Sequence, residues 1–134
     1  MRIDGWEARL NAVVAKHQLL PPEWGVSDCY MLPDDVVEAM IGKRMFPQAL
    51  GYKTEIGAGR KLRRFGFSNL AEAFEGRFSK IAAVEAIRGD IGVIERDGEY
   101  SGGVFTSIGF AIRPHDGPVA FLPLSSVTAA FRVE

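Results

Sequence analysis

The chain has 134 residues, which is enough for one domain with a core of its own. Its 16 basic and 17 acidic residues leave a net charge of −1, so no overall field favours nucleic acid or an anionic membrane as a partner. One cysteine excludes an internal disulfide, and no apolar run approaches the roughly 18 residues that suggest a membrane span. We expect a single domain, residues 1–134, that is made and folded in a cytoplasm.

The first half of the chain has helical spacing. Four apolar residues near the start share one stripe: Trp6, Leu10, Val13 and Val14. We expect Asp4 to cap this first helix and Pro21-Pro22 to stop it. Two further helices are predicted, one over residues 54–65 and a short one capped by Ser68. Their expected inward residues are Ile56, Leu62 and Phe65, and then Leu70, Ala73 and Phe74.

Between them, a second helix has four apolar residues on one face: Val36, Val37, Met40 and Ile41. Gly42 is expected to end it. Its start stays open between residues 27–28 and Leu32, because Pro33 lacks the N–H that an interior helical position donates. The choice matters for Cys29, which lies in this interval. The N–H groups and the dipole of a helix N-terminus stabilise a thiolate and lower the pKa of a cysteine.

After residue 79 the pattern changes to short apolar or β-rich runs. Strands are predicted over residues 91–94, 104–112 and 119–122, with a last segment over 129–133. The separators Arg96-Asp97-Gly98-Glu99 and Pro114-His115-Asp116-Gly117 are turn sequences, so consecutive antiparallel hairpins are the expected connection. Helices followed by an antiparallel sheet indicate an α+β fold, with the first half packed on one face of the second.

Cys29 is the candidate nucleophile of the chain. A cysteine nucleophile needs a base, usually an imidazole within hydrogen-bond reach. His17, at the end of the first helix, is interpreted as a solvated residue that favours the helix C-terminus. His115, in a turn that would project away from the sheet, is the remaining candidate base. The alternative for Cys29 is a small buried hydrophobic residue with no chemistry.

Other patterns are weaker. The cluster Arg60-Lys61-Leu62-Arg63-Arg64 is of a type that meets phosphates, but at helical spacing it more often forms a solvated face. One cysteine and two distant histidines lack zinc-ligand spacing. We therefore expect no metal, no cofactor and no nucleic-acid partner.

The segment Trp24-Gly25-Val26-Ser27-Asp28-Cys29 resembles the nucleophile segment of NlpC-type peptidoglycan endopeptidases, which are papain-like enzymes. Gly89-Asp90 resembles the dipeptide that opens their first sheet strand. The whole order is most similar to small uncharacterised phage and prophage proteins related to that fold. Further shared features are Gly103-Val104, Leu122-Pro123-Leu124 and Phe131-Arg132-Val133. The resemblance implies a papain-like, NlpC-related core in which helices pack on a small antiparallel sheet.

Two departures bear on activity. Catalytic NlpC-type proteins usually continue Asp-Cys with Ser-Gly, where this chain has Tyr30-Met31. They also have a histidine at the start of the second sheet strand, and the corresponding residues here, 100–103, contain none. Without a base the nucleophile stays weak and the leaving amine has no proton donor.

The resemblance therefore predicts a degenerate, non-catalytic structural protein of a tailed-phage virion, made in the host cytoplasm and located at the tail tip or baseplate. Its expected partners are other tail or baseplate proteins. The alternative is an active cysteine peptidase that opens peptidoglycan peptide cross-links during DNA entry, with Cys29 as nucleophile and His115 as base. A cytoplasmic prophage protein that acts on a host or rival factor is a third alternative.

Overall fold

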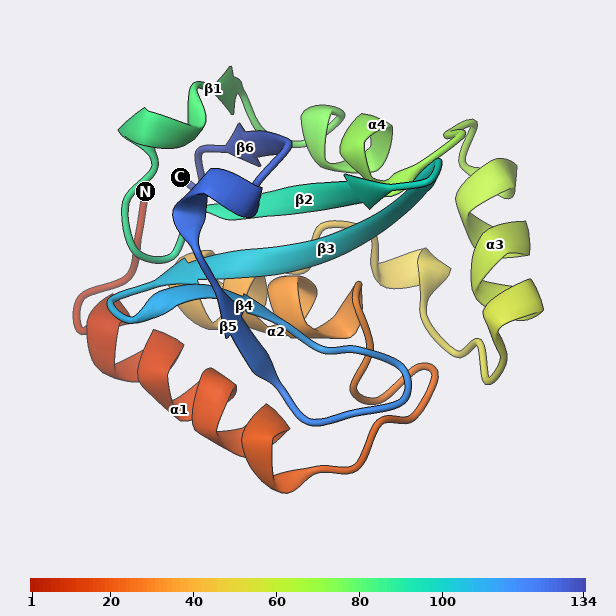
Figure 1. The fold of residues 1–134 in the computed structure, drawn as a ribbon, viewed down its shortest axis with the longest axis horizontal. Coiled ribbons are helices and arrows are strands. Elements are labelled where there is room, and N and C mark those ends of the chain that lie inside the picture. Colours follow the sequence, from red (N-terminus) through yellow and green to blue (C-terminus); the bar gives the residue numbers. More distant parts are fainter.

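Helices occupy the first half of the chain and strands the second in the computed structural model, which describes residues 1–134 (Figure 1). The α-helices are α1 (Trp6–Leu19), α2 (Met31–Ile41), α3 (Glu55–Arg64) and α4 (Leu70–Glu75). Three short 3₁₀ helices are Pro47–Ala49, Ala83–Glu85 and Leu124–Ser126. The α+β class predicted from the sequence is confirmed.

One antiparallel sheet contains all six strands, in the order β1-β6-β2-β3-β4-β5. The strands are β1 (Lys80–Ile81), β2 (Ile91–Arg96), β3 (Glu99–Thr106), β4 (Gly109–Ile112), β5 (Ala120–Leu122) and β6 (Ala129–Phe131). Asp97 and Gly98 both have positive φ in the turn between β2 and β3, as the predicted hairpin requires. The last strand of the chain inserts between β1 and β2, so the C-terminal segment lies inside the sheet and not at its edge.

The predicted strand over residues 104–112 is wrong in one respect. A turn at residues 107–108 divides it into β3 and β4, which pair with each other. The Thr106 hydroxyl donates a hydrogen bond to the Gly109 carbonyl oxygen at 2.8 Å and so closes this turn. Ser107 and Gly109 are turn-forming residues, and together with the Thr106 hydrogen bond they outweigh the β-rich character of the surrounding run.

Two helix caps also differ from the prediction. The residue that precedes α1 is Gly5 in a left-handed conformation, and no side chain caps this helix, so Asp4 does not. Asn69 caps α4 by accepting a hydrogen bond from the Glu72 N–H, and Ser68 donates its own N–H to the Glu72 carboxylate. Both helices nevertheless begin within two residues of the expected starts.

The main core lies between α1, α2 and α4 and one face of the sheet. Its largest fully buried side chains come from all of these elements, for example Leu10, Leu32, Phe74, Ile91 and Phe131. A second, smaller cluster on the opposite face contains Ile94, Phe105, Phe110 and Ala130. Both faces of the central strands are therefore covered.

Asp90 joins the two ends of the chain. Its carboxylate is fully buried and accepts hydrogen bonds from the Arg2 and Arg132 guanidinium groups and from the N–H groups of Ile87 and Val133. Four bonds satisfy both carboxylate oxygens, which a buried anion requires. The Gly-Asp dipeptide of the sequence therefore has a structural task.

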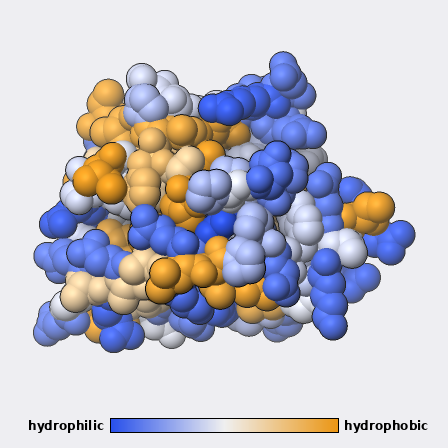
Figure 2. Space-filling model, turned by 60° about the horizontal axis from the view of Figure 1, so that its bottom comes forward, coloured by the Kyte–Doolittle hydropathy of each residue, from blue (hydrophilic) through white to orange (hydrophobic).

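No helix of the structure has the length and apolar character needed to cross a membrane. The surface seen from the lower side of Figure 1 carries patches of hydrophobic side chains among hydrophilic ones (Figure 2).

Ile56 of α3 was expected to face inward, and this expectation was wrong. Its side chain is exposed, with 67% of the surface of the residue accessible.

Candidate functional site

Asp28 organises the segment that leads into α2. One oxygen of its buried carboxylate accepts the N–H groups of Tyr30 at 2.9 Å and Met31 at 2.7 Å. The other accepts the Gly25 N–H at 2.7 Å and the Tyr52 hydroxyl at 2.8 Å. These bonds satisfy orphan N–H groups at the helix start and tie the preceding loop to it. Asp28 thereby fixes the position of Cys29.

The glycine of this loop is required by a close approach. A Cβ atom at Gly25 would lie 2.1 Å from the Tyr52 carbonyl oxygen, and the residue has φ of 85°. No other residue type fits there without moving the backbone. The architecture of the loop thus explains the glycine and the aspartate of the Trp-Gly-x-x-Asp-Cys pattern.

Cys29 lies two residues before α2, which begins at Met31. Burial, together with the Asp28 carboxylate, raises the pKa of the Cys29 thiol to about 12, although a hydrogen bond from the Gly102 backbone partly opposes this shift. At neutral pH the sulfur is therefore a protonated thiol and a weak nucleophile. The stabilisation by a helix N-terminus that the sequence suggested is outweighed by desolvation.

The residue of β3 that packs beside Cys29 is Gly102. A Cβ atom there would lie 2.4 Å from the Cys29 carbonyl oxygen and 3.0 Å from the Phe74 ring. An imidazole cannot occupy this strand position while the backbone of Cys29 stays where it is. The close packing of β3 against Cys29 therefore leaves no room for a histidine at this strand position.

His115 lies on the rim of a polar cavity of about 490 Å³ that Cys29 also lines. The imidazole is exposed and stacks on the Trp24 indole, with ring centroids 6.5 Å apart and an interplanar angle of 20°. No hydrogen bond joins it to the thiol. The structure therefore brings the two predicted site residues to one cavity without joining them.

His17 is not solvated, and that interpretation was wrong. It is fully buried, with Nδ1 2.7 Å from the Ser27 hydroxyl oxygen and Nε2 2.7 Å from a carboxylate oxygen of Asp35. The sequence contained the signal, because His17 follows Leu10 and Val14 at spacings of four and three and so shares their buried stripe.

This serine, histidine and aspartate have the order of a catalytic triad, but not its accessibility. Ser27 and His17 are fully buried, and neither borders either of the two cavities described here. Burial opposes ionisation of Asp35, but hydrogen bonds from His17 and Arg44 hold its pKa below the usual range. Because a substrate cannot reach the serine, we interpret these three residues as a buried polar contact that joins α1 to α2.

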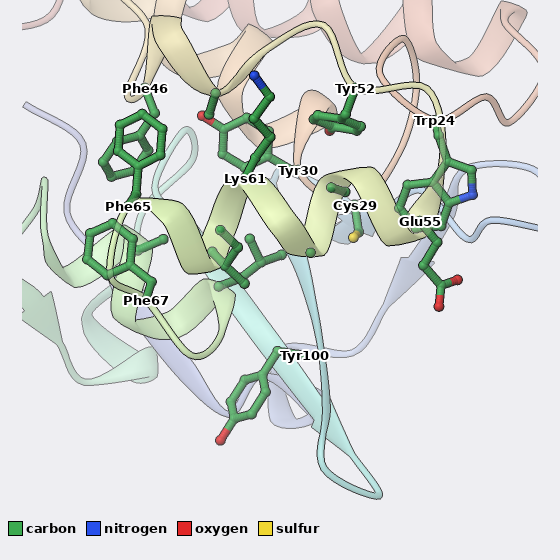
Figure 3. Close-up of a pocket in the computed structure, with 16 residues that line it drawn as sticks. Trp24, Cys29, Tyr30, Phe46, Tyr52, Glu55, Lys61, Phe65, Phe67 and Tyr100 are labelled. Atoms are coloured by element: carbon green, nitrogen blue, oxygen red, sulfur yellow. The ribbon is translucent and has the colours of Figure 1, made fainter.

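A second cavity lies beneath α3 and is apolar (Figure 3). Its volume is about 220 Å³, and thirteen of its sixteen lining residues are hydrophobic. In Figure 3, Phe46, Phe65 and Phe67 gather at one end of α3, and Trp24, Tyr52 and Cys29 lie toward the other. Sequence reasoning missed this cavity, because its walls come from segments far apart in the chain.

Cys29 lies at the boundary of the two cavities, since it lines both, as do Trp24 and Tyr100. A ligand here would meet an apolar wall on one side and the imidazole of His115 on the other. Nowhere in the structure do three or more histidine, cysteine or carboxylate side chains come close enough to hold a metal ion. The arrangement can bind apolar groups, but its thiol is poorly prepared for nucleophilic attack.

Residues 1–133 match the model of a protein family described as a domain of unknown function, DUF6950. No curated protein and no solved structure gives a significant match to the chain.

Proposed function

The chain belongs to the DUF6950 family, and we propose that it is a non-catalytic relative of the NlpC-type, papain-like peptidases that serves as a structural component of a tailed-phage virion. Its proposed place is the tail tip or baseplate, in contact with other tail proteins. The motif resemblance supports this proposal, and so does the arrangement of Cys29 before a helix that packs on an antiparallel sheet.

One observation carries the non-catalytic part of the proposal: the surroundings of the Cys29 thiol. Its pKa is raised to about 12, and the strand residue beside it is Gly102, where a side chain would collide with the Cys29 carbonyl oxygen. Cysteine catalysis requires a thiolate and a group that protonates the leaving amine. Here the thiol is protonated at neutral pH, and no base is bonded to it.

The cavity shared by Cys29 and His115 favours a second candidate, an active peptidase of peptidoglycan cross-links. In that case His115 would accept the thiol proton while the sulfur attacks the peptide carbonyl carbon, and would then give the proton to the leaving amine. Water would hydrolyse the resulting thioester. These reaction steps require the turn 114–117 to move so that His115 comes within hydrogen-bond distance of the thiol.

Cleavage of purified cross-linked muropeptides separates the two candidates. We expect no cleavage by the wild-type protein, and normal assembly and infectivity of virions that carry Cys29→Ala. Cleavage by the wild-type protein that a folded Cys29→Ala variant lacks would overturn the non-catalytic proposal, and its loss in His115→Ala would identify the base. Absence of the protein from purified virions would instead favour a cytoplasmic role.

A further inference from the structure

We propose that the apolar cavity beneath α3 and the basic outer face of α3 form a docking site for an acidic segment of a partner protein, which inserts one large aromatic side chain. The proposal rests on the structural role proposed above, because a non-catalytic component acts through its contacts with other proteins. It adds the site of that contact and the chemistry of the partner.

The size of the cavity sets the size of the inserted group. Its 220 Å³ is below the roughly 300–1,000 Å³ of pockets that bury drug-sized ligands. One large side chain fits this space better than an extended ligand does. Because most of the wall is hydrophobic, an apolar group that fills it gains contacts that the empty cavity lacks. Buried aromatic anchors of this kind dominate many protein interfaces.

The rings in the cavity wall favour an aromatic anchor. Phe46, Phe65 and Phe67 gather at one end of α3, and Trp24 and Tyr52 lie toward the other (Figure 3). Aromatic rings that pack edge-to-face or offset against one another gain more than their buried area alone provides. We therefore expect an aromatic anchor rather than an aliphatic one.

The outer face of α3 determines the charge of the partner. Arg60, Arg63 and Arg64 are exposed and have no acidic partner, because the ion pairs of the structure involve other basic residues. Like charges three and four positions apart on a helix repel each other. Glutamates or aspartates beside the anchor would relieve this repulsion. The positive charge is local, since the net charge of the chain is −1.

The weak attachment of α3 agrees with a binding role. It has no buried residue, and Gly57 and Gly59 lower its helical propensity. Helix α3 has two glycines, arginines that repel one another and an apolar cavity beneath it. Each feature lowers stability, and such departures from stable folding are expected at functional sites. A bound anchor would supply the apolar contacts that α3 now lacks.

Fluorescence anisotropy of a labelled heptapeptide tests the site directly. The probe has a central tryptophan between three glutamates on each side, and the protein is the full chain. We expect saturable binding that weakens with added salt. Alanine in place of the tryptophan should lower the affinity about 30-fold, as for a hot-spot residue. Lysines in place of the glutamates should abolish binding.

Paired variants locate the binding site. Ala58→Phe fills the cavity and should lower the affinity at least tenfold, whereas Val84→Ala, at an exposed apolar position outside α3, should not change it. Arg60→Glu combined with Arg64→Glu should abolish binding, and Lys43→Glu at another exposed position is the control. Circular dichroism checks that each variant is folded. Equal binding by Ala58→Phe and by its exposed control would overturn the proposal.

No saturable binding of the acidic peptide overturns the docking site, as does tighter binding of a single-stranded oligonucleotide of equal charge. These outcomes do not depend on Cys29 or on muropeptide cleavage, so the docking site and the non-catalytic role can fail separately.

Discussion

Helices α2 and α3 have similar lengths and opposite environments. Eight of the eleven residues of α2 are buried, whereas α3 has none among its ten. The buried carboxylate of Asp28 caps α2 with two of its four hydrogen bonds, and an exposed Thr54 hydroxyl caps α3 with one. The difference indicates that α2 stabilises the core, whereas α3 contributes little to it and can take part in binding.

The helix caps offer the largest test of this difference. Asp28→Ala leaves the N–H groups of Gly25, Tyr30 and Met31 and the Tyr52 hydroxyl without their acceptor. Because buried unpaired donors are costly, we expect a loss of about 3–4 kcal/mol in the free energy of unfolding. The matched change Thr54→Ala should cost about 1 kcal/mol or less. Urea denaturation followed by circular dichroism measures both, and similar losses would contradict the comparison.

Apolar truncations give the second test. Leu32 of α2 is fully buried, and Leu62 of α3 only partly. Leu32→Ala removes packed methyl groups and should cost about 3 kcal/mol through lost transfer energy and a residual cavity. Leu62→Ala borders an existing cavity and should cost only about 1 kcal/mol. A larger loss for Leu62 would show that α3 contributes to the core more than its exposure indicates.

Cys29 precedes α2 and also lines the cavity beneath α3, so the reactivity of its thiol gives the third test of the comparison. Because the pKa is raised to about 12, the thiolate fraction at pH 8.5 is about 1,000-fold lower than for an ordinary cysteine, and the folded protein should react with iodoacetamide about 1,000-fold more slowly than the protein unfolded in urea. The rate should rise with pH from about 9 to 12, since the thiolate forms only there. An apparent pKa below 7 would indicate an activated nucleophile and favour the peptidase.

The sequence predicts the helices and the sheet well because their signals are local. The stripe of α2, the end of α2 at Gly42 and the Asp97-Gly98 hairpin each depend on residues within a few positions of one another. Cys29 was identified in the same way, although the environment of its thiol depends on Gly102, which is 73 positions away. Local patterns place a residue on an element, but they do not reveal its neighbours from other elements.

The errors in the site have the same origin. His17 was assigned to solvent because of its place at the end of a helix, although it shares the stripe of Leu10 and Val14; its partners, Ser27 and Asp35, come from other segments and gave no local signal. The apolar cavity beneath α3 was not predicted, because Phe46, Tyr52 and Phe67 converge only in the folded chain. Burial and long-range packing decide pKa values and cavity shape, and neither is encoded by spacing alone.

The smallest expected effect concerns the glycines of α3. A Cβ atom at Gly59 would first meet the end of the flexible Arg63 side chain at 3.3 Å, so alanine can be accommodated there. Gly59→Ala should therefore stabilise the protein by about 0.5–1 kcal/mol, through the higher helical propensity of alanine. Gly25→Ala is the matched change beside α2, and we expect it to destabilise, because its Cβ would meet the Tyr52 carbonyl oxygen at 2.1 Å. Thermal unfolding distinguishes the two signs. Destabilisation by Gly59→Ala would instead show that the added methyl group is not accommodated in the cavity that Gly59 lines.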